Sequence, residues 1–155
     1  MMSTERALAY LRDKSYEDRV ITSDESTGTV AEAASALGVT EGEIAKSLTF
    51  RGKEGEAILI VVAGDKRIDN SKFKATFHTK AKMLKPDEVA EEIGHEIGGV
   101  TPFGAKEDVI IYLDESLRVY DVVYPACGSA NTAAKFFVDE LEGLFGKENM
   151  VDVTK

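Results

Sequence analysis

Tryptophan is absent from this 155-residue sequence, cysteine occurs once and proline three times. The single cysteine, Cys127, excludes an intramolecular disulfide and any zinc site built from several cysteines. No apolar run approaches the roughly 18 residues that a membrane-spanning helix needs. The opening residues carry acidic and basic side chains and no apolar signal core. The cytoplasm is therefore the expected location, and a membrane partner is not expected.

The overall composition is that of an ordinary globular domain, but the charges are unevenly distributed. Hydrophobic residues make up 43% and charged residues 30%, and the length predicts a single domain over residues 1–155. The net charge is −9, yet the basic segment, Lys66 to Lys85, holds seven lysines and arginines against one aspartate. It therefore carries +6 and the remainder −15. This asymmetry indicates either a face that binds nucleic acid in a salt-sensitive way or an ordinary solvated surface.

Hydrophobic spacing and capping residues predict helices and strands in irregular order. The expected helices cover residues 3–14, 29–38, 70–76, 86–93 and 139–145. The expected strands cover residues 19–22, 47–51, 57–63, 109–113, 118–123 and 132–137. Strands outnumber helices and do not alternate with them regularly. We therefore predict an α+β domain with a curved, mixed, barrel-like sheet flanked by helices.

The strongest local signal is the glycine loop, Gly98 to Gly104, which reads Gly-Gly-Val-Thr-Pro-Phe-Gly. Glycine and proline permit a rigid turn whose backbone N–H groups come close to a ligand. Such groups can hold a carbonyl oxygen while negative charge develops on it. The same composition also suits a tight structural turn. The loop alone leaves both interpretations open.

Two further places have the side chains for ligand contact. Lys46 stands among apolar neighbours at the start of an expected strand, where its amine can reach a phosphate or carboxyl oxygen or extend to solvent. Gly64 and Asp65 end the following strand, where loops often carry ligand contacts, and Asp65 is equally suited to capping a turn. Neither place names a reaction.

Cys127 precedes Gly-Ser-Ala-Asn and raises the question of a cysteine nucleophile. Neither His78 nor His95 lies in a motif that would activate it, so a small buried thiol is favoured. The two histidines also lack the spacing of metal ligands, and no phosphate-binding glycine loop of nucleotide-binding type occurs.

Seven short motifs together resemble a known family. They are Thr29–Ala34, Ala36–Val39, Ile44–Leu48, Val62–Asp65 with Arg67–Asp69, Gly98–Gly104, Leu113–Leu117 and Cys127–Ser129. In this order they resemble the YbaK/aminoacyl-tRNA synthetase-associated domain family, which includes the editing domain inserted in bacterial prolyl-tRNA synthetases. The resemblance spans roughly residues 19–153.

The resemblance implies a trans-editing deacylase that hydrolyses the ester of a mischarged tRNA without a metal or organic cofactor. It implies catalytic roles for Lys46, Gly99, Val100 and Gly104, with Lys46 on the tRNA end or the ester and the loop backbone on the ester carbonyl. It implies substrate contacts from Gly64, Asp65, Gly98, Thr101, Pro102, Phe103, Asp114, Gly128 and Ser129. The expected tRNA contacts in the basic segment are Lys66, Arg67, Lys72, Lys74, Lys80 and Lys82. In this family a ribose hydroxyl of the tRNA and a positioned water supply much of the chemistry.

The substrate is left open by departures from the family pattern. Residues 18–28 lack the histidine that many relatives carry before the first capping box. Cysteine, alanine, 2-aminobutyrate and serine are all candidates, with proline tRNA as the expected carrier. The expected partner is the acceptor end of an aminoacyl-tRNA, with a synthetase as an open second partner and no DNA. Two alternatives stand: a non-catalytic module of the same fold that binds tRNA or a synthetase, and a small-ester or peptide hydrolase that uses Cys127.

Overall fold

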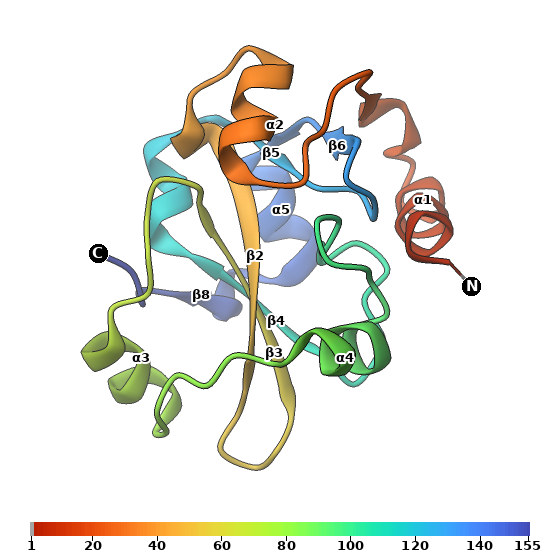
Figure 1. The fold of residues 1–155 in the computed structure, drawn as a ribbon. Coiled ribbons are helices and arrows are strands. Elements are labelled where there is room, and N and C mark those ends of the chain that lie inside the picture. The colour runs from red at the N-terminus through yellow and green to blue at the C-terminus, as the bar shows by residue number, and fades with distance from the viewer. Residues whose placement is uncertain (1) are drawn as a thin grey trace.

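A long hairpin forms the centre of the fold in the computed structural model, which describes residues 2–155 (Figure 1). Strand β2 (Ile44–Arg51) pairs antiparallel with β3 (Ala57–Ala63). Every residue of β3 is buried, which confirms the buried strand expected there. Strand β2 begins at Ile44 rather than at Ser47, so Lys46 lies within the ladder opposite Val62.

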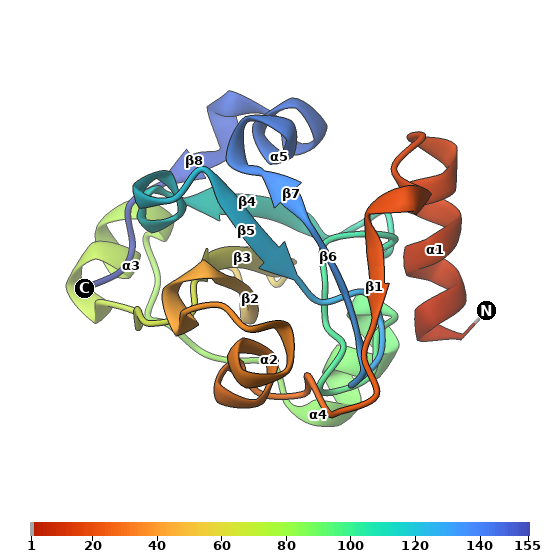
Figure 2. The ribbon, with the colours of Figure 1, turned by 90° about the horizontal axis from the view of Figure 1, so that it is seen from above.

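The other strands extend this hairpin into a six-stranded mixed sheet with the order β7-β5-β2-β3-β4-β8. The added strands are β4 (Ile110–Asp114), β5 (Val122–Pro125), β7 (Phe136–Phe137) and β8 (Met150–Val151). A separate two-stranded sheet joins β1 (Val20–Thr22) to β6 (Thr132–Ala134). Seen from above, the strands curl around the molecule instead of lying in one plane (Figure 2). The α+β fold with a curved mixed sheet is confirmed.

Five α-helices surround the sheet within the described residues. They are α1 (Ser3–Asp13), α2 (Val30–Leu37), α3 (Asn70–Phe77), α4 (Pro86–Glu88) and α5 (Val138–Phe145), and α4 continues as a π-helical turn over Val89–Ile93. The ends of α2 follow the expected chemistry, because the Thr29 hydroxyl accepts from the Glu32 N–H at 3.1 Å and Gly38 adopts φ 71°. No helix in the described part of the chain is long and apolar enough to cross a membrane.

The two faces of the hairpin pack against different helices. Leu59 and Val61 point to one side and share a cluster with residues of α1, of the π-helical turn after α4 and of α5. Ile58 and Ile60 point to the other side, where Phe73 of α3 covers them. This alternation is the period of two that a strand imposes, and it decides which β2 side chains face which side of the sheet.

One expected strand, residues 118–123, is wrong in its first part. Glu115–Val119 forms a 3-10 helix instead, and the strand begins only at Val122. The physical reason is a cap: the Asp114 carboxylate accepts from the Ser116 N–H at 2.9 Å and turns the chain as β4 ends.

Candidate active site

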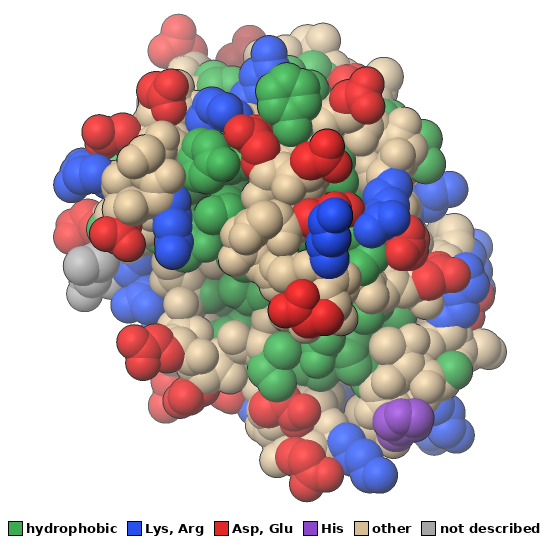
Figure 3. All heavy atoms as spheres, turned by 180° about the vertical axis from the view of Figure 1, so that it is seen from behind, with side chains coloured by type: hydrophobic (Ala, Val, Ile, Leu, Met, Phe, Trp, Pro, Cys, Tyr) green, Lys and Arg blue, Asp and Glu red, His purple; other side chains and the backbone are tan. Residues whose placement is uncertain are grey.

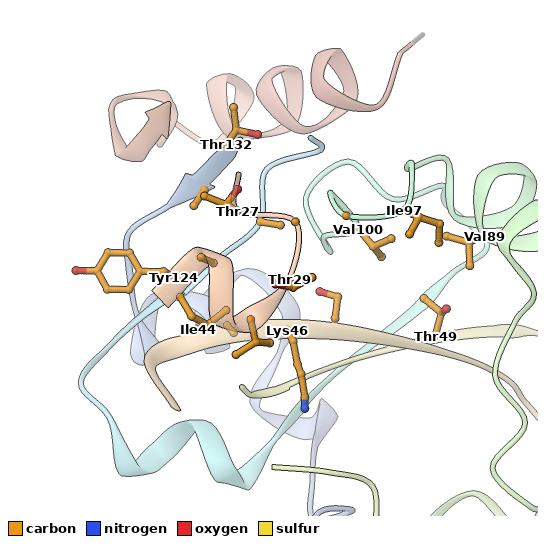
Figure 4. A pocket seen from close by; sticks show the side chains of 18 of the residues that line it. Thr27, Thr29, Ile44, Lys46, Thr49, Val89, Ile97, Val100, Tyr124 and Thr132 are labelled. Atoms are coloured by element: carbon orange, nitrogen blue, oxygen red, sulfur yellow. The ribbon is translucent and has the colours of Figure 1, made fainter. Parts of the chain in front are cut away.

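A cavity of about 260 Å³ opens beside β2, and segments distant in the sequence enclose it (Figure 4). Strand β2 contributes Ile44 to Ser47 and Thr49, the start of α2 contributes Thr27 to Val30 and Ala33, and the glycine loop contributes Gly98 and Val100. The connection after α3 closes the far side, because the Leu84 N–H donates to the Thr49 carbonyl at 3.1 Å along the edge of β2. The volume is small for a ligand site, below the usual range that starts at about 300 Å³.

The lining is apolar with a few hydroxyl groups. Among the described residues, no aspartate, glutamate, histidine or cysteine lines the cavity. Small side chains form part of its walls, namely those of Ala33, Ala45, Ala126 and Ala133. Two exposed apolar side chains lie at its boundary, Met83 at 57% and Ile97 at 63% exposure. Such a cavity offers shape, backbone groups and hydroxyls, and within the described residues no carboxylate, imidazole or thiol that would act as a general base or activate a hydroxyl.

Lys46 lies at the cavity, but its amine is already engaged. The Nζ group donates to the carbonyl oxygen of Gly64 at 3.3 Å and to that of Lys66. Figure 4 shows the side chain leaving β2 away from Thr29 and Val100. Partial burial lowers the pKa of this amine, and the nearby carboxylates of Asp65 and Glu41 act in the opposite direction. The charge therefore sits at the end of β3, on the side opposite the glycine loop.

The glycine loop divides between the cavity and the core. Gly98 and Val100 line the cavity, and within the described residues neither backbone N–H has a hydrogen-bond acceptor. The Gly99 N–H donates to the Glu96 carbonyl at 3.1 Å, and Gly99 packs against the backbone of Gly128. Only the first part of the loop can therefore present free amides to a ligand.

The remainder of the loop is structural in its contacts. Thr101, Pro102 and Phe103 are buried, and the Phe103 ring lies 5.0 Å from that of Phe136. Gly104 adopts φ 73° against α1, where Arg6 Nε donates to its carbonyl oxygen at 2.8 Å. These four residues do not line the cavity.

Buried His95 holds this loop to the N-terminal helix. Its Nε2 lies 2.8 Å from the Phe103 carbonyl, which can only accept, so Nε2 carries the proton and Nδ1 accepts from the Ser3 hydroxyl at 2.9 Å. Burial lowers the His95 pKa, and the Arg6 charge lowers it further. The imidazole is neutral at pH 7 and is not a free base.

The other expected substrate residues lie outside the cavity lining. Gly64 accepts from Lys46, and exposed Asp65 lies beside Tyr120. Asp114 is fully buried, and its carboxylate accepts from the N–H groups of Ser116 and Val153 and from the Thr154 hydroxyl at 2.7–2.9 Å. Gly128 touches the start of α1, and the Ser129 hydroxyl bonds within its own turn. Asp114 therefore has no free oxygen to offer a ligand without losing a protein contact.

The basic segment spreads over α3 and the connection that follows it. Lys72 is engaged, since its amine lies 3.1 Å from the Asp152 carboxylate and donates to the Thr154 carbonyl. Lys74 and Lys80 line a shallow hollow on the surface of α3. Of the lysines and arginines expected to contact tRNA, only Lys72 forms an ion pair within the described residues.

Cys127 is fully buried, and burial raises the pKa of its thiol to about 12. A thiol of that kind stays protonated at neutral pH, and a protonated thiol is a poor nucleophile. The structural interpretation of Cys127 is the one that these contacts favour.

Comparison with known proteins identifies the family. The family model described as the aminoacyl-tRNA editing domain matches residues 24–144. The chain belongs to the aminoacyl-tRNA editing domain family. The resemblance first indicated by the motif order is thereby confirmed, and the matched region includes β2, the glycine loop and the whole cavity lining.

Relatives of this editing domain occur as separate chains and as parts of larger ones. The chain is 45% identical over 154 residues to the uncharacterized protein YwhH of Bacillus subtilis (strain 168), covering 99% of this chain and 98% of that one. It is 39% identical over 93 residues to the proline–tRNA ligase of Kosmotoga olearia, covering 58% of this chain and only 16% of the ligase. A crystal structure described as a candidate trans-editing enzyme for prolyl tRNA synthetase superposes with a TM-score of 0.88 at 34% identity, covering 99% of this chain and 97% of that one.

Several residues that line the cavity of this editing domain were not found from the sequence. They are Thr27, Ser47, Met83, Ile97 and Tyr124, which lie on five separate segments of the chain. Ser47 and Ile97 had a local signal. Ser47 stands beside Lys46 and shares a strand face with Ala45 and Thr49, and Ile97 directly precedes the glycine loop. The others come to the cavity through long-range packing that local spacing does not express.

Proposed function

We propose that this protein is an aminoacyl-tRNA deacylase, which hydrolyses the ester between a small non-cognate amino acid and the 3′ end of a tRNA. Proline tRNA is the carrier that the relatives favour, since the match includes a proline–tRNA ligase and a structure described for prolyl-tRNA editing. Membership of the editing domain family supports the reaction class.

The observation that carries the proposal is the pairing of a small apolar cavity with free backbone amides at its edge. The aminoacyl side chain would enter the cavity, and the N–H groups of Gly98 and Val100 would donate to the ester carbonyl oxygen. Water attacks the carbonyl carbon, the amides stabilise the negative oxygen, and the ribose oxygen leaves with a proton. An aminoacyl ester is already activated, so positioning and oxyanion stabilisation are sufficient without a side-chain nucleophile.

The cavity size also supports an editing role. A synthetase pocket rejects a smaller amino acid by only about 1–3 kcal/mol per methylene, so accuracy requires a second site that admits the small misfit. The alanine-lined walls and the volume of about 260 Å³ suit such a misfit. We assign Lys46 the tRNA end, because its charged amine lies beside the backbone of Lys66 rather than inside the apolar cavity.

The test is deacylation of proline tRNA charged with cysteine, alanine, 2-aminobutyrate, serine or proline. We expect rapid loss of at least one non-cognate amino acid with prolyl-tRNA spared. Lys46→Ala should lower kcat/KM about 10–100-fold, the range for a hydrogen bond to a charged group. Lys53→Ala, on the exposed hairpin turn, is the matched control and should be unaffected.

Failure of the wild-type protein to release any of these amino acids would contradict the proposal. If the protein then still bound tRNA, the non-catalytic module of the same fold would replace it. Full activity of a Cys127→Ala variant would exclude the hydrolase that depends on Cys127, whose thiol is fully buried and therefore out of reach of an alkylating reagent.

A further inference from the structure

The first turn of α1 is linked to the glycine loop on both sides, although α1 lies outside residues 24–144, which the family model matches. The Ser3 hydroxyl donates to His95 Nδ1 at 2.9 Å and accepts from the Glu96 N–H at 3.2 Å, just before the loop. His95 Nε2 extends this link to the Phe103 carbonyl at 2.8 Å, near the end of the loop. A single hydroxyl is therefore connected to the segments that precede and follow the free amides.

The same turn of α1 also contacts the Gly128 turn, which lies against the glycine loop. Gly128 adopts φ 93°, and a Cβ atom there would lie 2.6 Å from the Ser3 carbonyl oxygen and 2.8 Å from the Thr4 Cα atom. The Thr4 hydroxyl reaches the Gly128 carbonyl at 3.5 Å. The Gly128 N–H donates to the Gly99 carbonyl at 2.9 Å. The first turn of α1 therefore reaches Gly99 by a second route.

The route through Gly128 fixes the direction of the Val100 N–H. A trans peptide unit is planar, so its C=O and N–H bonds point in opposite directions. The Gly99 C=O and the Val100 N–H belong to one such unit, and this C=O is directed at Gly128. The Val100 N–H therefore points away from the Gly128 turn, and Val100 lines the cavity. Its freedom from a protein acceptor within the described residues follows from this orientation.

The route through Glu96 fixes the direction of the Gly98 N–H. The Gly99 N–H donates to the Glu96 carbonyl at 3.1 Å and closes a turn, in which Gly98 at the third position has φ 91°. Ile97 at the second position has no positive φ. This combination is that of a type II turn, whose central peptide is flipped relative to a type I turn. The turn thus sets where the Gly98 N–H points, and its first residue is held by Ser3.

We infer that the first turn of α1, chiefly Ser3, positions the Gly98 and Val100 amides for deacylation. The inference rests on the proposed deacylase function and adds a residue that does not line the cavity. Backbone amides stabilise a developing negative charge best when they are aimed before the reaction begins. Ser3 therefore acts on the transition state through the loop, and the binding of the substrate depends on it much less.

The experiment measures kcat and KM of Ser3→Ala and Glu5→Ala on a mischarged tRNA that the wild type hydrolyses. Ser3→Ala should lower kcat about tenfold and change KM by less than about twofold, because the amides lose their aim and are not removed. Outright loss of one such donor costs roughly 100–1000-fold. The matched control is Glu5→Ala, an exposed position in the same turn. It removes a charge that favours the helix start and should leave kcat unchanged.

The backbone amide NMR signals of Gly98 and Val100 in the free protein give a readout that needs no substrate. Both signals should move in Ser3→Ala and stay in place in Glu5→Ala. If urea unfolding shows that Ser3→Ala is not folded, Thr4→Val replaces it in both measurements, since it keeps the shape and removes only the hydroxyl.

Unmoved signals, an unchanged kcat, or an equal loss of kcat in the control would overturn the inference and leave the deacylase function standing. Absence of hydrolysis by the wild type would instead overturn the proposed function, and with it any role of the turn in the reaction.

Discussion

At the residue scale, Gly99 is required for close approach rather than for an unusual backbone angle. A Cβ atom placed there would lie 2.3 Å from the Gly128 carbonyl carbon and the Ser129 nitrogen, which are backbone atoms. The Gly128 N–H donates to the Gly99 carbonyl at 2.9 Å, so the two loops are held together at this point. The amides of Gly98 and Val100 take their positions from this contact.

Gly99→Ala should therefore destabilise the protein and slow deacylation together. We expect a loss of about 1–3 kcal/mol in the free energy of unfolding, the usual cost of forcing extra volume into packed structure. The matched control is Gly143→Ala in α5, where a Cβ meets nothing within 4 Å. That change should raise the free energy of unfolding by roughly 0.5–1 kcal/mol, because alanine favours a helix more than glycine does. Urea unfolding measures both, and a neutral Gly99→Ala variant would show that the loops separate freely.

The residues with special chemistry could be predicted from the sequence only where the signal is local. Gly98, Val100 and Lys46 stand in distinctive motifs, and all three line the cavity. Thr27 and Met83 stand in ordinary polar or lysine-rich stretches, and their place at the cavity depends on how α2 and the post-α3 connection dock on β2. The spacing of residues along the sequence does not predict how these segments pack on β2.

At the element scale, the N-terminal helix is coupled to the site through His95. Ser3 at the start of α1 donates to His95 Nδ1, and the Glu96 N–H donates to the Ser3 hydroxyl at 3.2 Å. Helix α4 and the π-helical turn after it are held to β2. Arg51 of β2 forms ion pairs with Glu88 of α4 at 2.7 Å and with Glu92 of the turn at 2.5 Å. The glycine loop is therefore held by contacts with α1, and it follows a helical segment that is itself held to β2.

Protonation of His95 should loosen this anchor. Its pKa is lowered in the folded protein, so the folded state binds the proton more weakly than the unfolded chain does. The stability is fully present above the unfolded pKa of about 6.5 and falls as the pH drops towards the lowered folded value. The free energy of unfolding, measured by urea titration from pH 8 downwards, should show this loss.

His95→Gln should lack that part of the pH dependence and should lose about 1–3 kcal/mol at pH 8, because one of the two ring hydrogen bonds is broken. His78→Asn is the control, since His78 ends α3 with φ 60° on the surface and asparagine tolerates that backbone conformation. Identical pH profiles for wild type and His95→Gln would show that other groups cause the acid loss.

Most elements were predictable because their caps and periods are local, and the exception shows the limit. The expected strand at 118–123 has the right apolar residues, and Val122 and Val123 do pair with β7. Its first half is instead a 3-10 helix begun by Asp114, whose carboxylate also binds Val153 and Thr154 near the other end of the chain. The bond from Ser116 to Asp114 is a local capping signal that competes with the apolar pattern of residues 118–123. The contacts of Asp114 with Val153 and Thr154 are long-range, and local spacing does not express them.

At the scale of the whole molecule, the negative net charge and the basic segment act against each other. The face opposite the view of Figure 1 shows acidic and basic side chains interspersed, without a continuous basic field (Figure 3). A tRNA that approaches this molecule is repelled by most of its surface and attracted by one part. The basic segment should therefore decide orientation as well as affinity.

Reversing two of its free charges should weaken tRNA use in a salt-dependent way. Lys74 and Lys80 line the hollow on α3, and Lys74→Glu with Lys80→Glu should lower kcat/KM at low salt. The slope of log kcat/KM against log salt should become shallower by about 1 for each phosphate that a lysine no longer neutralises. Lys72 is unsuitable for this test, because its reversal would also break the ion pair with Asp152.

The matched control reverses Lys14 and Lys135, which changes the net charge equally. Lys14 follows α1 and Lys135 follows β6, and both elements lie across the molecule from α3 in two perpendicular views (Figures 1 and 2). If long-range repulsion alone governed tRNA use, both double variants would lose activity to the same degree and with the same slope. If only the Lys74→Glu, Lys80→Glu variant lost activity, the acceptor end of the tRNA would lie over α3. That is the side of the hairpin on which the Lys46 amine lies.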